Sequence, residues 1–308
     1  MSKPIKIRMG GYGPPTTGFS KSLKFIGDRL EKQFGDDVAI DYVFNIMDHG
    51  HKAEDILTLV ESGEITLGYQ SSSYLTDRVP ELGFVDLPFL FSSNAQARGA
   101  MDGALGEFLV RKTEDRINYR ILGWFENGFR HISNKLRSIH LPSDMKDMKI
   151  RVLPSEIHRR TFELLGAKAM RMDLTEAIAM IKAGTLDAQE NPLANTVTYG
   201  VHKFHKFHTL SYHFYISRPI FLHRTSFEAW PDEVRRAMRS AVTDAVAHQR
   251  KLALEEHESS RKAIEAEGCD INELTPSEHD AFVAAVQPLL ADARKTYGET
   301  MFGMVPKA

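Results

Sequence analysis

The stretch "KIRVLPSEIHRRTFELLGAKAMRM", residues 149–172, holds a complete strand–helix–strand unit. Ile150 and Val152 alternate with charged neighbours, which predicts a strand, and an amphipathic segment separates it from a second strand-like run. Strands that alternate with helices in this way are typical of a mainly parallel α/β sheet. Arg151 falls on the opposite face of the first strand. The strand pattern alone favours a structural charge paired with Asp or Glu, and it leaves open a guanidinium held in a cleft for an anion.

The same alternation extends towards the N-terminus and forms a first α/β series. Its expected strands are residues 4–10, 38–44 and 65–69. A second series begins after Asn127, following a strand predicted at residues 118–125. Two similar series predict two lobes. We expect one lobe from residues 1–127 plus 217–256, and the other from residues 128–216 plus 257–308.

The longest periodic segment of the chain predicts one very long helix. Pro231 stands where the first helical residue is expected, and helical character continues to Gly268. More than thirty residues, at about 1.5 Å each, make a helix of about 50 Å. Because that length exceeds one small lobe, we expect the helix to run across both lobes.

Composition excludes several classes of protein. The net charge of −2 offers no basic field for nucleic acid, and no apolar run is long enough to span a bilayer. The lone Cys269 forms no internal disulfide and no cysteine-based zinc site. The start "MSKPIKIRMG" lacks the features of a secretory signal, which read literally indicates a cytoplasmic protein. An exported protein whose signal peptide has been replaced by a single Met in cloning would begin in the same way.

Motifs of the common enzyme classes are missing, including GxSxG, HExxH and GxxxxGK[ST]. The turn "GYGPPT", residues 11–16, begins like a dinucleotide-binding fingerprint. Its third glycine is missing, and two prolines replace backbone donors that a pyrophosphate would need. A cytoplasmic dehydrogenase-type α/β enzyme that uses this turn is the alternative function. We expect no cofactor.

The segment "HKFHKFH" carries His202, His205 and His208, and imidazole binds zinc well. No Asp, Glu or Cys lies close in the sequence, however, and the histidines alternate with Lys and Phe. A packed or solvated amphipathic segment therefore explains the pattern better than a metal site, and we expect no metal.

Four stretches follow one another in an order that points to one family. They are "LPFLF", "NGFRHISN", "DMKIRV" and "LLGAKAMRMDLTEAIAMIKAGTLDAQENP", and the long helix comes after them. With these motifs the chain resembles, over nearly its whole length, the substrate-binding proteins of tripartite ATP-independent periplasmic (TRAP) transporters, which include dicarboxylate and sialic acid binders. The resemblance implies an α/β fold of the two-lobed periplasmic binding protein type (type II-like), whose lobes are linked by crossing strands and a long helix.

The same resemblance implies a non-enzymatic periplasmic receptor. Its lobes would close by a hinge over a small organic acid, and the protein would deliver that acid to the TRAP membrane permease subunits. A removed signal peptide then explains the N-terminus. A sensor lobe that binds a similar acid but signals to a partner protein is a second alternative.

Site residues are carried over from the family motifs one by one. Arg151, in "KIRV", would form a two-pronged salt bridge with the ligand carboxylate, and Arg130, in "NGFR", is the second arginine. Asn191, in "QENP", would border the same site. Further ligand-binding candidates are Ser71, Ser72, Tyr12, His51, Tyr212 and His213.

Departures from the family pattern affect the choice of ligand. Arg171 stands where the family often has an uncharged residue, and Ser71 stands where some relatives carry an acidic one. The serine weakens the case for a ligand with an amino group. Phe129, together with Tyr12 and Tyr212, suggests a partly aromatic pocket. A monocarboxylate with an apolar or aromatic body and a dicarboxylate therefore both stay open.

Overall fold

The computed structural model describes residues 3–307. Contacts between these residues in space group them into two compact units. Unit 1 consists of the chain up to Ser71, Val110–Glu126 and Ser217–Glu255. Unit 2 consists of Ser72–Leu109, Asn127–Ile216 and the chain from Glu256 onward. The lobe boundaries expected from the sequence stay a prediction. They differ from this grouping at residues 72–109, 127 and 256, which we expected in the first lobe and which group with unit 2.

Unit 1 is built on a short parallel sheet. β1 (Ile5–Gly10) lies between β2 (Val38–Val43) and β3 (Leu67–Tyr69) and pairs in parallel with both. These are the three strands that the sequence predicts. The part of β8 (Phe207–His223) that belongs to unit 1 is the antiparallel neighbour of β3.

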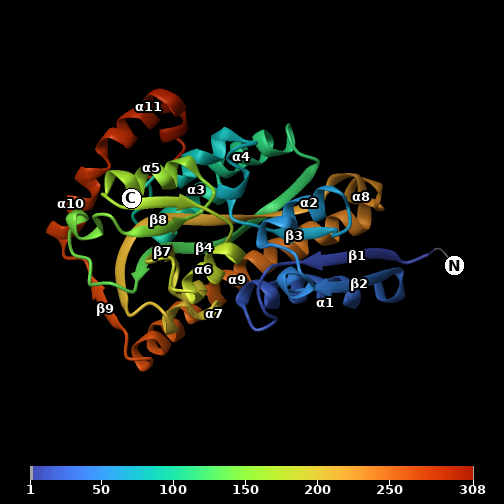
Figure 1. The fold of residues 1–308 in the computed structure, drawn as a ribbon. Helices are drawn as coiled ribbons and strands as arrows, with labels where there is room; N and C mark the ends of the chain where they lie inside the picture. Colours follow the sequence, from blue (N-terminus) through green and yellow to red (C-terminus); the bar gives the residue numbers. More distant parts are fainter. Residues whose placement is uncertain (1–2, 308) are drawn as a thin grey trace. The chain divides into compact units, whose positions relative to one another are not determined.

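The first helix of unit 1 has clear start and stop signals. α1 (Gly18–Phe34) begins after Thr17, whose hydroxyl accepts a hydrogen bond from the backbone N–H of Ser20. It ends at Gly35, where φ is 53°, a value that glycine adopts without strain. In Figure 1, α1 runs beside β1 and β2. The shorter helices of this unit are α2 (Ile56–Glu61) and α8 (Arg224–Ala229).

Unit 2 contains the strand–helix–strand unit predicted for residues 149–172. β5 (Lys149–Val152) and β6 (Lys168–Arg171) pair in parallel, and α5 (Glu156–Leu164) connects them. β7 (Ala188–Asn191) pairs in parallel with β5 on its other side. The sheet continues with the unit 2 part of β4 (Tyr119–Asn134), antiparallel to β7, and β9 (Asp270–Glu273) pairs with β8. The remaining helices of unit 2 are α3 (Asn94–Asp102), α6 (Leu174–Lys182), α7 (Leu193–Thr198), α10 (Pro276–Ala285) and α11 (Gln287–Phe302).

Several elements run from one unit into the other. β4 continues from Tyr119 to Asn134, so the strand predicted at residues 118–125 is present but longer than expected, and it extends past Asn127 into unit 2. β8 begins in unit 2 and ends in unit 1, which is the reverse of β4. α4 (Ala104–Glu114) also begins in unit 2 and ends in unit 1. α9 (Asp232–Ala266) has 35 residues, about 52 Å at 1.5 Å per residue. The predicted long helix is therefore confirmed. None of the helices within residues 3–307 has the length and apolar character that crossing a bilayer requires.

The core of unit 2 joins its sheet to the C-terminal helices. Ile150 and Val152 of β5 are fully buried together with Phe162 of α5 and with Phe282 and Val286 near the end of the chain. A Thr275–Glu278 capping box fixes the start of α10, which carries Phe282 into this core. The terminal helices are thus part of the packing that holds the strands of unit 2 in place.

We predict that Phe282→Ala lowers the free energy of unfolding by about 3–5 kcal/mol, because it leaves a cavity in this core. Urea unfolding followed by far-ultraviolet circular dichroism measures the change. The control is Leu254→Ala, at a side chain that is 51% exposed and whose loss should cost well under about 1 kcal/mol. Equal effects of the two substitutions would show that the C-terminal helices do not contribute to the core.

Candidate ligand-binding site

Strand pairing places polar side chains together on one face of the unit 2 sheet. Arg151 is in register with Gln189, and Asn191 is in register with His131. Paired residues share a face, as do residues two apart along a strand. Arg151, Gln189, Asn191 and His131 therefore lie on one face, which we call the polar face. The opposite face carries Ile150 and belongs to the apolar core.

Arg151 is buried on the polar face without a carboxylate partner. It is 1% exposed, its Nε donates to the carbonyl oxygen of Met172 at 3.1 Å, and one terminal nitrogen donates to the hydroxyl of Tyr74 at 3.1 Å. Its other terminal nitrogen has no hydrogen-bond partner. No Asp or Glu of residues 3–307 forms an ion pair with it, so the internal pairing that the strand pattern favours is not formed.

Arg130 is on the opposite face and is already paired. Its guanidinium forms a fork with the Glu190 carboxylate, from Nε to one oxygen and from a terminal nitrogen to the other at 3.0 Å. The same terminal nitrogen donates to the Glu190 carbonyl oxygen at 2.6 Å. Both side chains are buried. The ligand-binding role expected for Arg130 stays untested, and this geometry favours a structural role.

Two buried histidines, His158 and His213, lie near the Glu190 carboxylate. His213 Nε2 lies 3.5 Å from one of its oxygens, and His158 Nδ1 lies 4.0 Å from the other. Burial alone would raise the pKa of Glu190, but the charge of Arg130 and its hydrogen bonds to the carboxylate hold that pKa well below its usual value. Burial lowers the pKa of His213 despite the neighbouring carboxylate. His213, a predicted ligand-binding residue, is therefore fully buried in unit 2 beside the Glu190 carboxylate.

Neutral amides form a connected chain on the polar face. Asn191 donates to Gln189 Oε1 at 3.1 Å and accepts from Asn195 at 3.2 Å. Asn195 also donates to the Asn127 side-chain oxygen at 3.3 Å, and Gln189 donates to the Thr196 hydroxyl at 3.2 Å. Asn191, which we expected to border the same site as Arg151, lies on the same face as Arg151, and its role at the ligand stays a prediction.

The candidates from the N-terminal third of the chain belong to unit 1, apart from Ser72. Ser71 is buried, and its backbone N–H donates to Gln70, whereas the buried hydroxyl of Ser72 has no partner. Tyr12 is buried, and its ring lies 5.4 Å from that of Tyr69. His51 is half-exposed, and its Nδ1 lies 3.5 Å from an Asp55 carboxylate oxygen.

Tyr212 belongs to an aromatic group in unit 2. Its ring contacts the rings of Phe129 and His131, with centroid distances of 5.7 and 4.6 Å. Its hydroxyl donates to Glu273 at 3.4 Å. Its backbone has φ of 49°, in the left-handed region that is uncommon for a bulky residue. Phe129, His131 and Tyr212 thus form one aromatic group in unit 2, and the partly aromatic pocket expected from Phe129, Tyr12 and Tyr212 stays a prediction.

Sequence reasoning missed two buried residues. His131 is 2% exposed, and neither ring nitrogen has a hydrogen-bond partner. In unit 1 the Arg218 guanidinium carbon lies 4.0 Å from the Phe19 ring centroid and 5.0 Å from that of Tyr12, and its buried Nε has no partner. The sequence signal for Arg218 was a charged residue inside the apolar stretch "YISRPIF", residues 215–221.

The three histidines of "HKFHKFH" are packed rather than gathered around a metal. His202 is in a 3-10 turn and His208 is on β8, so they do not share a helix. His208 Nε2 contacts the carbonyl oxygen of His205 at 3.0 Å, and Ser133 contacts the His205 ring. Within residues 3–307, no three His, Cys, Asp or Glu side chains are arranged to hold a metal ion.

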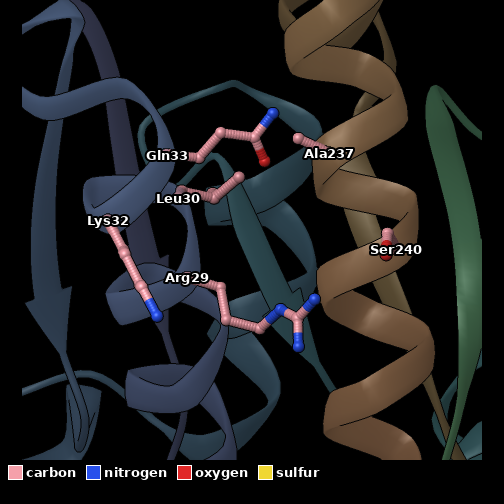
Figure 2. Close-up of a pocket in the computed structure, with 6 residues that line it drawn as sticks. All are labelled: Arg29, Leu30, Lys32, Gln33, Ala237 and Ser240. Atoms are coloured by element: carbon pink, nitrogen blue, oxygen red, sulfur yellow. The ribbon is translucent and has the colours of Figure 1, made fainter.

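A surface pocket of about 380 Å³ lies in unit 1 between α1 and α9. Figure 2 shows Arg29 extending from α1 towards α9. Arg29 pairs with Asp244 at 2.7 Å, and both side chains are well exposed. The pocket contains none of the predicted site residues, and its polar groups are ordinary surface side chains.

Protein-family and sequence comparisons place the chain among solute-binding proteins. A family model described as bacterial extracellular solute-binding protein, family 7, matches residues 10–296. The 2,3-diketo-L-gulonate-binding periplasmic protein of Escherichia coli is 26% identical over 234 residues, which cover 76% of this chain and 70% of that protein. The C4-dicarboxylate-binding periplasmic protein of Rhodobacter capsulatus is 23% identical and covers 100% of this chain and 92% of its own length.

Solved structures agree with the sequence comparisons. The sugar acid binding protein of Advenella mimigardefordensis, in complex with galactonate, has a TM-score of 0.93 at 25% identity and covers 99% of this chain and 98% of its own. A TRAP periplasmic solute-binding protein of Polaromonas, bound to D-erythronate, has a TM-score of 0.92 at 24% identity and covers 98% and 99%. These matches confirm the predicted family, fold class and receptor function, and they give no support to the dehydrogenase alternative.

We predict that Glu190→Ala destabilises the protein by about 3–5 kcal/mol, because it leaves the Arg130 charge buried and unpaired. Urea unfolding measures the change. Glu156→Ala is the control, since it breaks an ion pair between two well-exposed side chains, Glu156 and Arg159, and should cost at most about 1 kcal/mol. A loss below about 1 kcal/mol for Glu190→Ala would contradict the structural role of the pair.

We also predict that stability falls as the pH drops from about 6.5 towards 4. Burial lowers the pKa of His208 to about 4 and that of His205 to about 3. The unfolded chain therefore takes up these protons first, which favours unfolding by up to about 1.4 kcal/mol per pH unit for each histidine. Urea unfolding at pH 7 and pH 5 should show a smaller loss for His208→Gln than for the parent. His49→Gln, at an exposed position, should leave the loss unchanged.

Proposed function

Because the chain belongs to the bacterial extracellular solute-binding proteins of family 7, we propose that it binds a small organic acid through Arg151. The observation that supports this assignment is a buried guanidinium with an unpartnered terminal nitrogen and no counter-ion among residues 3–307. Asn191, on the same face, is proposed to border the ligand.

Physical chemistry supports a carboxylate as the missing partner. A guanidinium presents a rigid fork of donors that matches both oxygens of a carboxylate. An isolated buried charge is costly, because its attraction to water is lost and nothing replaces it. Met172 and Tyr74 supply neutral acceptors to Arg151 but no negative charge. A bound carboxylate would compensate that charge in a setting of low dielectric, where the attraction is strong.

The relatives named above are described as binding galactonate, erythronate, 2,3-diketo-L-gulonate and C4-dicarboxylates, and all of these ligands carry a carboxylate. Arg151 is the residue of unit 2 best suited to that shared group. Arg130 has its fork occupied by Glu190 and is left out of the proposed site.

Family members act outside the cytoplasm, and on this ground we propose a periplasmic location for the protein and delivery of the acid to TRAP membrane permease subunits. Closure of the lobes over the ligand, which the resemblance implies, stays a prediction.

We expect Arg151→Met to lose at least about 100-fold in affinity for any acid that the parent binds, because one partner of a buried ion pair is removed. A thermal-shift screen with mono-, di-, keto-, aromatic and sugar acids identifies the ligand, since saturation at about 100 times Kd adds about 2.7 kcal/mol. Isothermal titration calorimetry then compares the variants.

Arg160→Met serves as the matched control, because Arg160 is an exposed arginine of unit 2 that pairs with Asp292. Arg151→Lys tests the fork itself, since lysine keeps the charge but loses the paired donors. If Arg151→Lys or Arg151→Met binds as tightly as the parent, or no acid binds the parent at all, the proposed function is wrong.

A further inference from the structure

The polar face carries two unpartnered groups that the carboxylate site does not use. Both ring nitrogens of His131 and the side-chain nitrogen of Asn127 are buried without a hydrogen-bond partner. Asn127 is held by Asn195, which also holds Asn191, so its orientation is fixed by the amide chain. Buried polar groups without partners are rare, because each costs free energy comparable to a lost hydrogen bond.

The register of the sheet gives the separation of these groups from Arg151. His131 pairs with Asn191, and Arg151 pairs with Gln189. The two residues are therefore two strands apart and two residues apart along the strands, which is about 12 Å between Cα atoms. Because both side chains occupy the same face, a ligand of several carbons can be held at one end by Arg151 while a more distant group lies near His131.

His131 is a neutral group at this position. Burial lowers the pKa of its ring well below the ordinary value, and the permanent charge of Arg130 acts in the same direction. A neutral imidazole offers one donor and one acceptor. The ring is packed against Tyr212 at 4.6 Å, edge to face, so its direction is fixed.

Hydroxyl groups match this chemistry better than a second carboxylate. A hydroxyl both donates and accepts, as do the neutral imidazole and the amide chain. A second carboxylate only accepts, and its burial would require a second cation. Arg151 is the only buried cation on the polar face among the described unit 2 residues of β4, β5 and β7.

From these observations we propose that His131 and Asn127 recognise a hydroxyl group of the ligand, so that the acid bound by Arg151 is a hydroxylated monocarboxylate. This inference rests on the proposed function. It assigns His131 and Asn127 as specificity-determining residues, and it favours a polyhydroxy acid over both a simple fatty acid and a dicarboxylate.

Matched acids that differ only in their hydroxyl groups test the inference. Calorimetric titration of the parent compares D-gluconate with hexanoate, D-erythronate with butanoate, and both pairs with succinate and adipate. We expect at least one hydroxylated acid to bind at least about tenfold tighter than its unsubstituted partner and than either dicarboxylate, because a site built around polar groups rejects a ligand that leaves them unpaired.

Substitution of His131 provides the second half of the test. His131→Phe should weaken binding of the preferred hydroxylated acid by about tenfold and change binding of the unsubstituted partner far less. His131→Gln, which keeps a donor and an acceptor, should recover part of the loss. Asn127→Leu should show the same selectivity change, and it keeps the inference testable if His131→Phe fails to fold.

His208→Phe is the matched control, because it removes another buried neutral histidine of unit 2 that is already hydrogen-bonded to a backbone carbonyl. It should leave the preference between the paired acids unchanged. A parent that prefers a dicarboxylate, or substitutions of His131 and Asn127 that weaken both members of a pair equally, would overturn the inference. If Arg151→Met still abolishes binding in that case, the proposed function stands without it.

Discussion

Side-chain alternation along three neighbouring strands decides which charges of unit 2 are satisfied within the protein. Arg130 and Glu190 point into the core side of the sheet, where each is the counter-ion of the other. Arg151, one strand further on and on the other face, receives only a carbonyl and a hydroxyl. A shift of register by one residue would exchange these environments, because it moves every side chain to the opposite face. The binding chemistry proposed for Arg151 therefore depends on the same register that builds the core.

Much of this arrangement could be read from the sequence. Alternating Ile150 and Val152 revealed the strand and the face of Arg151, and the periodic segment after Pro231 revealed the long helix. Motif spacing related Asn191 to the same site, and strand pairing places it on the same face. These features are encoded locally, by a period of two or of about 3.6 residues, which is why they survive without structural information.

Other features depend on partners that are remote in the chain. Arg130 was assigned to the ligand from its motif, but its pairing with Glu190 joins residues 60 positions apart and has no local signal. His131 is adjacent to Arg130 in the motif, yet the pleat of β4 directs the two to opposite faces. The strand predicted at residues 118–125 continues to Asn134 as β4, an extension that the sequence analysis did not predict.

The division of the chain between the units has a consequence for synthesis. Unit 1 is assembled from three separate segments, the last of which ends at Glu255, and unit 2 needs residues near the C-terminus for its core. At about 5–20 residues per second, translation of these 308 residues takes about 15–60 s. Neither unit can complete its native contacts on the ribosome until most of that time has passed. Nascent chains should therefore be sensitive to proteases until late in elongation, and the closing of such long loops should make folding slow compared with a small helical domain.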